Sequence, residues 1–137
     1  MIDIELGTLL ADASQAAAYF VDIRDRAALV EAANALDFSV AAANLASADD
    51  KDSLLEQIAE ALEFPATFGG NWDALADSLG DLSWLPAPGY VLLIDHCTAL
   101  RDAEPDDFAT LLELLDEAAA AHARAGVPFW ADRKSVV

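Results

Sequence analysis

The sequence YVLLID at residues 90–95 is the stretch that decides the fold. It is a short, continuous apolar run, which is typical of a strand whose two faces are both buried. A strand of this kind belongs to a mostly parallel sheet that is covered by helices. The run therefore predicts an α/β architecture with this strand in its core.

The residues that follow this strand predict a long helix and a last strand. Pro105 suits the first turn of a helix, and Gly126 suits its end. Val127 to Ala131 is apolar and predicts a strand, in which Pro128 requires an edge position or a place among the first residues. The inner face of the helix is expected to contain Phe108, Leu111, Leu112, Leu115, Ala118, Ala119 and His122.

The residues that precede the strand predict two further strands and three helices. Asp25, Ser53 (with Glu56, as a capping box) and Asn71 are the expected helix N-caps. Residues 1–15 give no clear pattern beyond one possible helical turn at 8–11. The predicted elements are strands at 18–23 and 38–45, and helices at 26–36, from 53 to before Phe64, and at 72–79 with Gly80 near the end.

The order is β-α-β-α-α-β-α-β, which predicts a small, mostly parallel sheet flanked by helices. A chain of 137 residues is near the commonest size of one globular domain, so we expect residues 1–137 to form a single domain. Cys97 is the only cysteine, so an internal disulfide is excluded. The longest uncharged run, 82–94, is too short to span a membrane, and the acidic start is unlike a signal peptide. We therefore expect a cytoplasmic protein.

The charge balance is strongly acidic. Seven basic and 25 acidic residues give a net charge of −18. Such a chain is repelled by nucleic acid and by anionic membranes. Solubility or adaptation to salt explains part of this charge, and a basic protein partner is the other explanation.

Asp73, Asp77 and Asp81 are spaced by four residues, so they lie on one face of the helix if it continues to residue 81. Like charges at this spacing destabilise a helix by about 0.2–0.5 kcal/mol per pair. An acid late in a helix also opposes the helix dipole. The row is either a solvated face of an acidic protein or a set of carboxylates for a cationic partner.

Other kinds of site are not supported. Gly69 and Gly70 before a helix suggest phosphate binding, but the acids that follow and the lack of Lys or Arg between Lys51 and Arg101 argue against it. Asp95, His96, Cys97 and His122 lack the spacing of a zinc site. No pair of carboxylates indicates acid–base catalysis, so we predict neither a metal, a cofactor nor an enzyme.

The residues around the acidic row resemble the barstar family, the intracellular inhibitors of barnase-type ribonucleases. The resemblance rests on Phe64-Pro65, Phe68-Gly69, Asn71 to Leu75 and Asp77, and it covers residues 38–131. Residues 1–37 are then an N-terminal addition of a strand and a helix. The resemblance implies that one helix and its leading loop block a nuclease active site. Its implied partner-binding residues are Thr67, Phe68, Gly69, Gly70, Asn71, Trp72, Asp73 and Asp77.

Three of these positions and the neighbouring Ala76 depart from the best-known member of the family. It has a tyrosine at Thr67, an acid at Gly70, a leucine at Trp72 and a tryptophan at Ala76. Trp72 is either an interface aromatic or a core anchor, and its helical spacing to buried-type residues favours the core. A further acidic contact of the family maps near Ala121, so it is missing or supplied by Asp116 or Glu117.

We therefore predict a stoichiometric inhibitor, of immunity or antitoxin type, of a basic ribonuclease that is barnase-like or a toxin nuclease. Asp73 and Asp77 are the expected electrostatic anchors, and the free protein is expected to be a monomer that binds neither nucleic acid nor membrane. The alternative is an acidic interaction domain that binds a basic partner other than a nuclease. The two hypotheses differ in whether the partner cleaves RNA.

Overall fold

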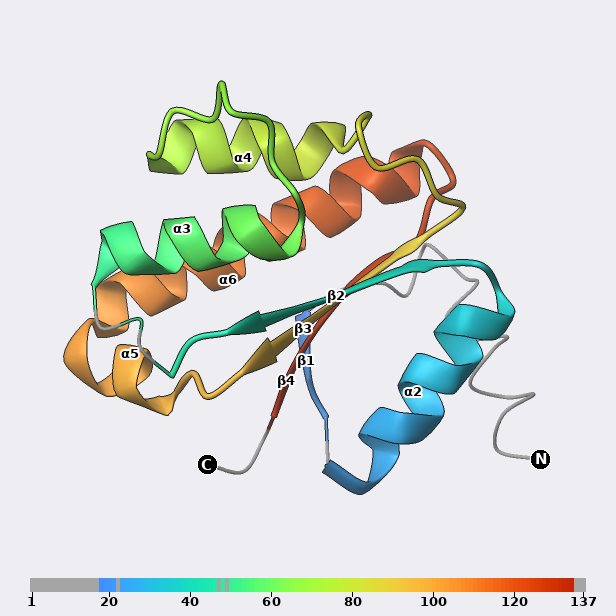
Figure 1. The fold of residues 1–137 in the computed structure, drawn as a ribbon, viewed down its shortest axis with the longest axis horizontal. Helices are drawn as coiled ribbons and strands as arrows, with labels where there is room; N and C mark the ends of the chain where they lie inside the picture. Colours follow the sequence, from blue (N-terminus) through green and yellow to red (C-terminus); the bar gives the residue numbers. More distant parts are fainter. Residues whose placement is uncertain (1–17, 22, 47, 49, 135–137) are drawn as a thin grey trace.

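A four-stranded, wholly parallel sheet forms the centre of the computed structural model, which describes residues 18–21, 23–46, 48 and 50–134 (Figure 1). The strand order is β1-β4-β3-β2. The strands are β1 (Ala18–Val21), β2 (Ser39–Asn44), β3 (Tyr90–Asp95) and β4 (Phe129–Lys134). The helices are α2 (Ile23–Ala35), α3 (Lys51–Ala61), α4 (Trp72–Asp81), α5 (Thr98–Ala103) and α6 (Pro105–Arg124).

β3 is an inner strand, as its apolar run predicts. It pairs with β2 on one side and β4 on the other, and its first five residues are buried. β4 also has two neighbours, so of the two positions that Pro128 allows, the edge is not the one observed: the proline lies at the start of the strand. Pro128 stands directly before β4, where its missing N–H is not needed, and its carbonyl accepts a hydrogen bond from the backbone N–H of Tyr90 at 2.9 Å.

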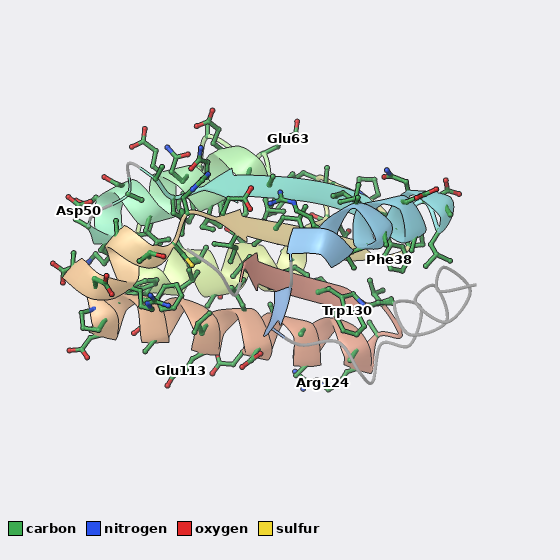
Figure 2. All side chains as sticks on the ribbon, turned by 90° about the horizontal axis from the view of Figure 1, so that it is seen from below. Phe38, Asp50, Glu63, Glu113, Arg124 and Trp130 are labelled. Atoms are coloured by element: carbon green, nitrogen blue, oxygen red, sulfur yellow. The ribbon has the colours of Figure 1, made fainter. Side chains whose placement is uncertain are left out.

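Helices cover both faces of the sheet. Figure 1 shows α2 on one side of the strands, and α3, α4 and α6 on the other. The face under α2 forms a small core in which Phe38 and Trp130, labelled in Figure 2, pack with Leu29, Val91 and Leu93. The larger core on the opposite face includes Leu54, Leu55, Ile58, Leu75, Leu79, Leu92, Ile94, Leu111, Leu115 and Phe129. The mostly parallel α/β sheet predicted from the sequence is thus confirmed.

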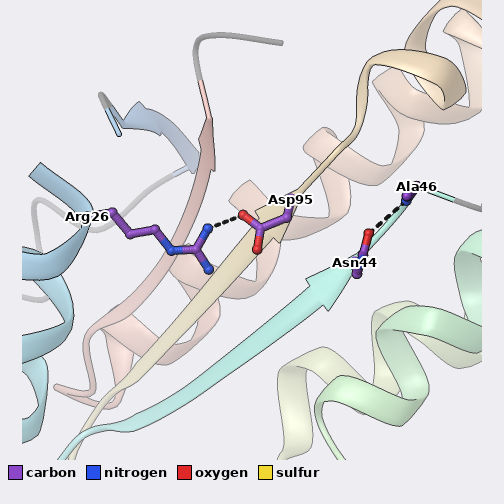
Figure 3. Close-up of polar contacts among 4 residues, drawn as sticks. All are labelled: Arg26, Asn44, Ala46 and Asp95. Carbon is purple, nitrogen blue, oxygen red and sulfur yellow. Dashed lines mark hydrogen bonds and ion pairs between the residues drawn. The ribbon is translucent and has the colours of Figure 1, made fainter. Parts of the chain in front are cut away.

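The carboxyl ends of β2 and β3 hold two polar contacts, drawn in Figure 3. Arg26 of α2 forms an ion pair with Asp95 at the end of β3. The Asn44 side chain at the end of β2 accepts a hydrogen bond from the backbone N–H of Ala46 at 2.9 Å. The first contact ties α2 to the central strand of the sheet.

Several predicted helix boundaries are wrong. α3 begins two residues earlier than predicted, because Asp50 and not Ser53 is its N-cap: the Asp50 carboxylate accepts a hydrogen bond from the Ser53 backbone N–H at 2.8 Å. Asp25 lies inside α2 and does not cap it. Gly80 is the last residue but one of α4, which ends at Asp81 and not at residue 79; Leu82 is its C-cap, in a left-handed conformation with φ of 51°.

The remaining differences concern α5 and the N-terminal residues. α5 was not predicted, since its N-cap Cys97 makes no side-chain capping bond and the sequence gives no start signal there. The possible helical turn at 8–11 lies outside the described residues. Within the described residues, no helix has both the length and the apolar character needed to cross a bilayer.

Candidate functional site

α4 begins with the cap that the sequence predicts. The backbone of Asn71 is extended, and its side-chain oxygen accepts a hydrogen bond from the Ala74 backbone N–H at 2.8 Å. Gly70, directly before it, has φ of 69°, a left-handed conformation that favours glycine. The cap and the glycine together fix the point at which the chain turns from the loop into α4.

The inner face of α4 packs against the larger hydrophobic core. Leu75 and Leu79 are fully buried, and the half-buried Trp72 packs against the same cluster. The Leu79 carbonyl accepts a hydrogen bond from Nε2 of the buried His122 at 2.8 Å, and the His122 ring stacks on Phe129 with centroids 5.5 Å apart. His122 therefore anchors the end of α4 to α6 and β4.

The outer face of α4 carries the acidic row. Because the helix continues to residue 81, Asp73, Asp77 and Asp81 lie one turn apart on one face, and all three are exposed. None of their carboxylates forms a hydrogen bond or an ion pair with another residue of the described part of the chain. The helix thus carries three like charges that no described residue neutralises.

A groove of about 480 Å³ runs beside this face, between α4 and the loop that precedes it. An edge-to-face cluster supports the groove: the ring centroid of Phe64 is 4.9 Å from that of Phe68 and 5.6 Å from that of Trp84. The Trp84 indole N–H donates to the Leu62 carbonyl at 3.0 Å. The lining residues are Pro65, Thr67, Phe68, Gly69, Ala74, Asp77, Ser78, Asp81, Ser83 and Trp84.

The groove brings together only part of the predicted site. Thr67, Phe68, Gly69 and Asp77 line it. The other four predicted residues lie beside it: Gly70, Asn71 and Asp73 are exposed, and Trp72 packs against the core.

Sequence reasoning did not select Asp81 and Trp84 as site residues, although both line the groove. The spacing of the acidic row already placed Asp81 on the correct face of α4. Trp84 lies in the loop that follows the helix, and the fold brings it to the groove. No sequence motif indicates that position.

Other candidate groups lie apart from this groove. On α6, Asp116 and Glu117 are exposed and Ala121 is half-buried. Cys97 is buried. Within the described residues, no group of three His, Cys, Asp or Glu side chains is arranged to hold a metal ion.

Comparison with known sequences decides the family. The family model described as "Barstar (barnase inhibitor)" matches residues 38–133, which contain β2, β3, α4, the groove and all but the last residue of β4. The chain belongs to the barstar family. β1 and α2 precede the matched residues; in this barstar-family chain β1 is an edge strand and α2 covers the second face of the sheet.

Comparison with solved structures shows the fold alone. A chain in the "Structure of Drosophila ORC bound to DNA" is similar, with a TM-score of 0.59 and 18% identity. The match covers 98% of this barstar-family chain but only 36% of the Drosophila chain. No curated protein matches the sequence.

Proposed function

We propose that this barstar-family protein is a stoichiometric inhibitor of a basic ribonuclease and acts in the cytoplasm as a free monomer. α4 and the loop at 65–70 enter the nuclease active site and exclude RNA. The observation that carries the proposal is the row of exposed carboxylates on α4, none of which has a partner among the described residues. The row lies in a chain whose family is described by its inhibition of barnase.

The electrostatics of α4 support this function. The active site of a ribonuclease must attract phosphate, so it presents cationic side chains. These side chains can bind carboxylates in place of the phosphates of RNA. Asp77 points into the groove region and Asp73 lies one turn before it, so both are available as anchors. The net charge of −18 also speeds encounter with a basic partner.

The test is an RNA-cleavage assay in which this protein is titrated into barnase and into ribonucleases encoded beside its own gene. We expect activity to fall linearly to an end point at one inhibitor per nuclease. Asp77→Ala should weaken inhibition by about 30-fold or more, the size of a charged hot spot, without lowering the midpoint of thermal unfolding. Glu113→Gln, an exposed acid on α6 far along the chain from the groove, is the matched control (Figure 2).

Two results would contradict the proposal. If none of these nucleases is inhibited while a basic protein without RNA-cleaving activity binds the same helix, the protein is an interaction domain of another kind. If Asp77→Ala unfolds the protein, the carboxylate has a structural role.

A further inference from the structure

The outer side of the edge strand β2 carries unpaired backbone groups. The Ser39 N–H donates to the Gly89 carbonyl at 2.9 Å, and the Leu45 N–H donates to the Asp95 carbonyl at 2.8 Å. The odd-numbered residues of β2 therefore face β3, and the residues between them direct their N–H and C=O groups away from the sheet. Within the described residues, none of these outward N–H groups donates a hydrogen bond: those of Val40, Ala42 and Asn44.

This edge lacks the features that usually prevent another strand from pairing with a sheet. Natural edge strands are protected by charged side chains, proline, a bulge or a very short length. β2 has six residues, SVAAAN, with no charge and no proline, and its register with β3 is continuous from Ser39 to Asn44. Ala42 and Asn44 are exposed, so this part of the strand is accessible. An extended segment of another molecule can therefore add to β2 through backbone hydrogen bonds.

The surroundings of β2 are acidic. α3 packs against β2 (Figure 1), and Asp37, which is exposed, lies two residues before the strand. Lys51 is the only basic residue between Asp37 and Glu63. The acids of α3 and of the residue after its C-cap are all exposed and are spaced by three or four residues: Asp52, Glu56, Glu60 and Glu63. A cationic strand gains from these charges beside a neutral edge.

The same charges distinguish between the possible occupants of the edge. A second copy of the chain would bring another α3, with the same exposed acids, to the same edge, and each copy has a net charge of −18. Like charges oppose such a pairing. A nucleic acid is repelled for the same reason. An extended basic segment of another protein is the occupant that both the backbone groups and the charges favour.

We propose that β2 receives an extended segment of another protein, rich in lysine or arginine, which pairs with the open edge and continues the sheet. The outward backbone groups of Val40, Ala42 and Asn44 provide the hydrogen bonds, and the acids of α3 select the charge. None of the residues that line the groove beside α4 belongs to β2, so this is a second binding surface. The inference does not depend on the proposed function, because it requires no nuclease.

The experiment is a titration of the ¹⁵N-labelled full chain with an eight-residue peptide in which lysine alternates with valine. The amides of Val40, Ala42 and Asn44 should shift to saturation and become protected from hydrogen exchange. The amides of Ala41 and Ala43, which already face β3, should change little. This alternation is specific to strand addition, since a peptide held by charge alone does not distinguish odd from even residues.

Two control peptides separate backbone pairing from charge. The same peptide with every backbone amide methylated keeps its charge but has no N–H to donate, so it should bind at least tenfold more weakly. A peptide with glutamate in place of lysine should not bind.

Variants of the protein test the two contributions in turn. Ala42→Lys changes an exposed side chain and adds a gatekeeper charge to the edge, so it should weaken binding of the lysine peptide about fivefold or more, whereas Ala42→Thr should bind like the original. Glu56→Gln combined with Glu60→Gln should weaken binding about two- to fivefold, the range of exposed ion pairs. Glu113→Gln on α6 should have no effect.

Three results would overturn the proposal. The first is a methylated peptide that binds as tightly as the original, which would reduce the contact to charge alone. The second is a set of shifts that does not saturate or does not alternate along β2. The third is protection of the same amides without peptide that rises with protein concentration and with added salt, because the occupant would then be a second copy of the chain.

Discussion

At the scale of single residues, Tyr90 links the central strand to the loop after α4. Its hydroxyl donates to the Leu85 carbonyl at 2.7 Å, and its side chain is buried. Burial raises the pKa of Tyr90 above its ordinary value of 10.0. The folded protein thus holds this proton more tightly than the unfolded chain, so the resulting stability is complete below pH 10 and falls as the pH rises towards the folded-state pKa.

Replacing this tyrosine should remove both effects. Tyr90→Phe is expected to lower the free energy of unfolding by about 1 kcal/mol at neutral pH, the usual net value of one hydrogen bond. It should also flatten the decline in stability above pH 10, because the replaced ring cannot ionise. Urea unfolding at a series of pH values checks both effects. A decline that is equally steep in the variant would show that other groups cause it.

Gly89 is a second position at which one atom decides the packing. A Cβ built there would lie 2.6 Å from the ring of Phe38, in the small core under α2. Gly89→Ala should therefore cost about 1–3 kcal/mol of stability through overpacking, and Phe38→Leu in the same chain should recover part of it.

Gly80 provides the matched control. A Cβ at this helical position meets nothing within 4 Å, so Gly80→Ala should stabilise the protein by about 0.5–1 kcal/mol. The midpoints of urea unfolding for the two alanine variants should move in opposite directions. If they move in the same direction, the contact with Phe38 does not determine the cost at Gly89.

At the scale of the elements, α4 combines a stable start with an unfavourable outer face. Asp77 has a like charge one turn before it and another one turn after it. Asp77→Asn should therefore stabilise the free protein by about 0.4–1 kcal/mol, twice the effect of a single like-charged pair. Asp73→Asn relieves one pair but gives up a favourable charge in the first turn, so its net effect should be near zero.

Unfolding measurements at low and high salt check this contrast. The gain from Asp77→Asn should shrink in high salt, because the repulsion it removes is screened there. If Asp77→Asn destabilises the protein instead, the carboxylate makes a favourable contact in the free state, and the acidic row cannot be explained by a partner.

Some of the helices and strands could be predicted from the sequence and others could not. Strand β3 and helix α6 were predictable because each has a single strong periodic or apolar signal, and Asn71 marks the start of α4 by its own side-chain chemistry. The Asp50 cap was missed because Ser53 and Glu56 imitate a capping box three residues further on. α5 has no start signal at all.

The site was predictable only where it is local in sequence. The acidic row on α4 follows from helical spacing, since residues four apart share a face. The groove does not, because Trp84 comes from another segment and reaches Phe68 only through their shared contact with Phe64. Strand order could not be predicted from the sequence either, because the pairing of β1 with β4 depends on packing between segments more than 100 residues apart.

At the scale of the whole molecule, the part outside the family match completes the second face of the sheet. α2 covers Val91, Leu93 and Trp130, and the ion pair between Arg26 and Asp95 ties it to the central strand. α4 lies on the opposite side of the sheet (Figure 1), and the groove is lined by residues of α4 and of the loops on either side of it. α2 therefore does not cover the outer face of α4, which stays open to a partner.

The net charge of −18 should make salt act in opposite directions on folding and on binding. Mutual repulsion among the carboxylates opposes the compact state, so added salt should raise the midpoint of thermal unfolding of the free protein. The same charge accelerates encounter with a basic nuclease, so added salt should slow association by roughly one to two orders of magnitude between low and high ionic strength. Dissociation should change much less, because contacts already formed are shielded from solvent.

Stopped-flow mixing with the inhibited nuclease and thermal unfolding of the free protein, both over one salt series, measure the two effects. Sucrose is the control, since it stabilises folded proteins without screening charge and should not slow association in the manner of salt once viscosity is matched. Association that is insensitive to salt would mean that the field of the whole chain does not guide encounter. The acidic composition would then serve solubility, and the case for a basic partner would rest on α4 and its groove alone.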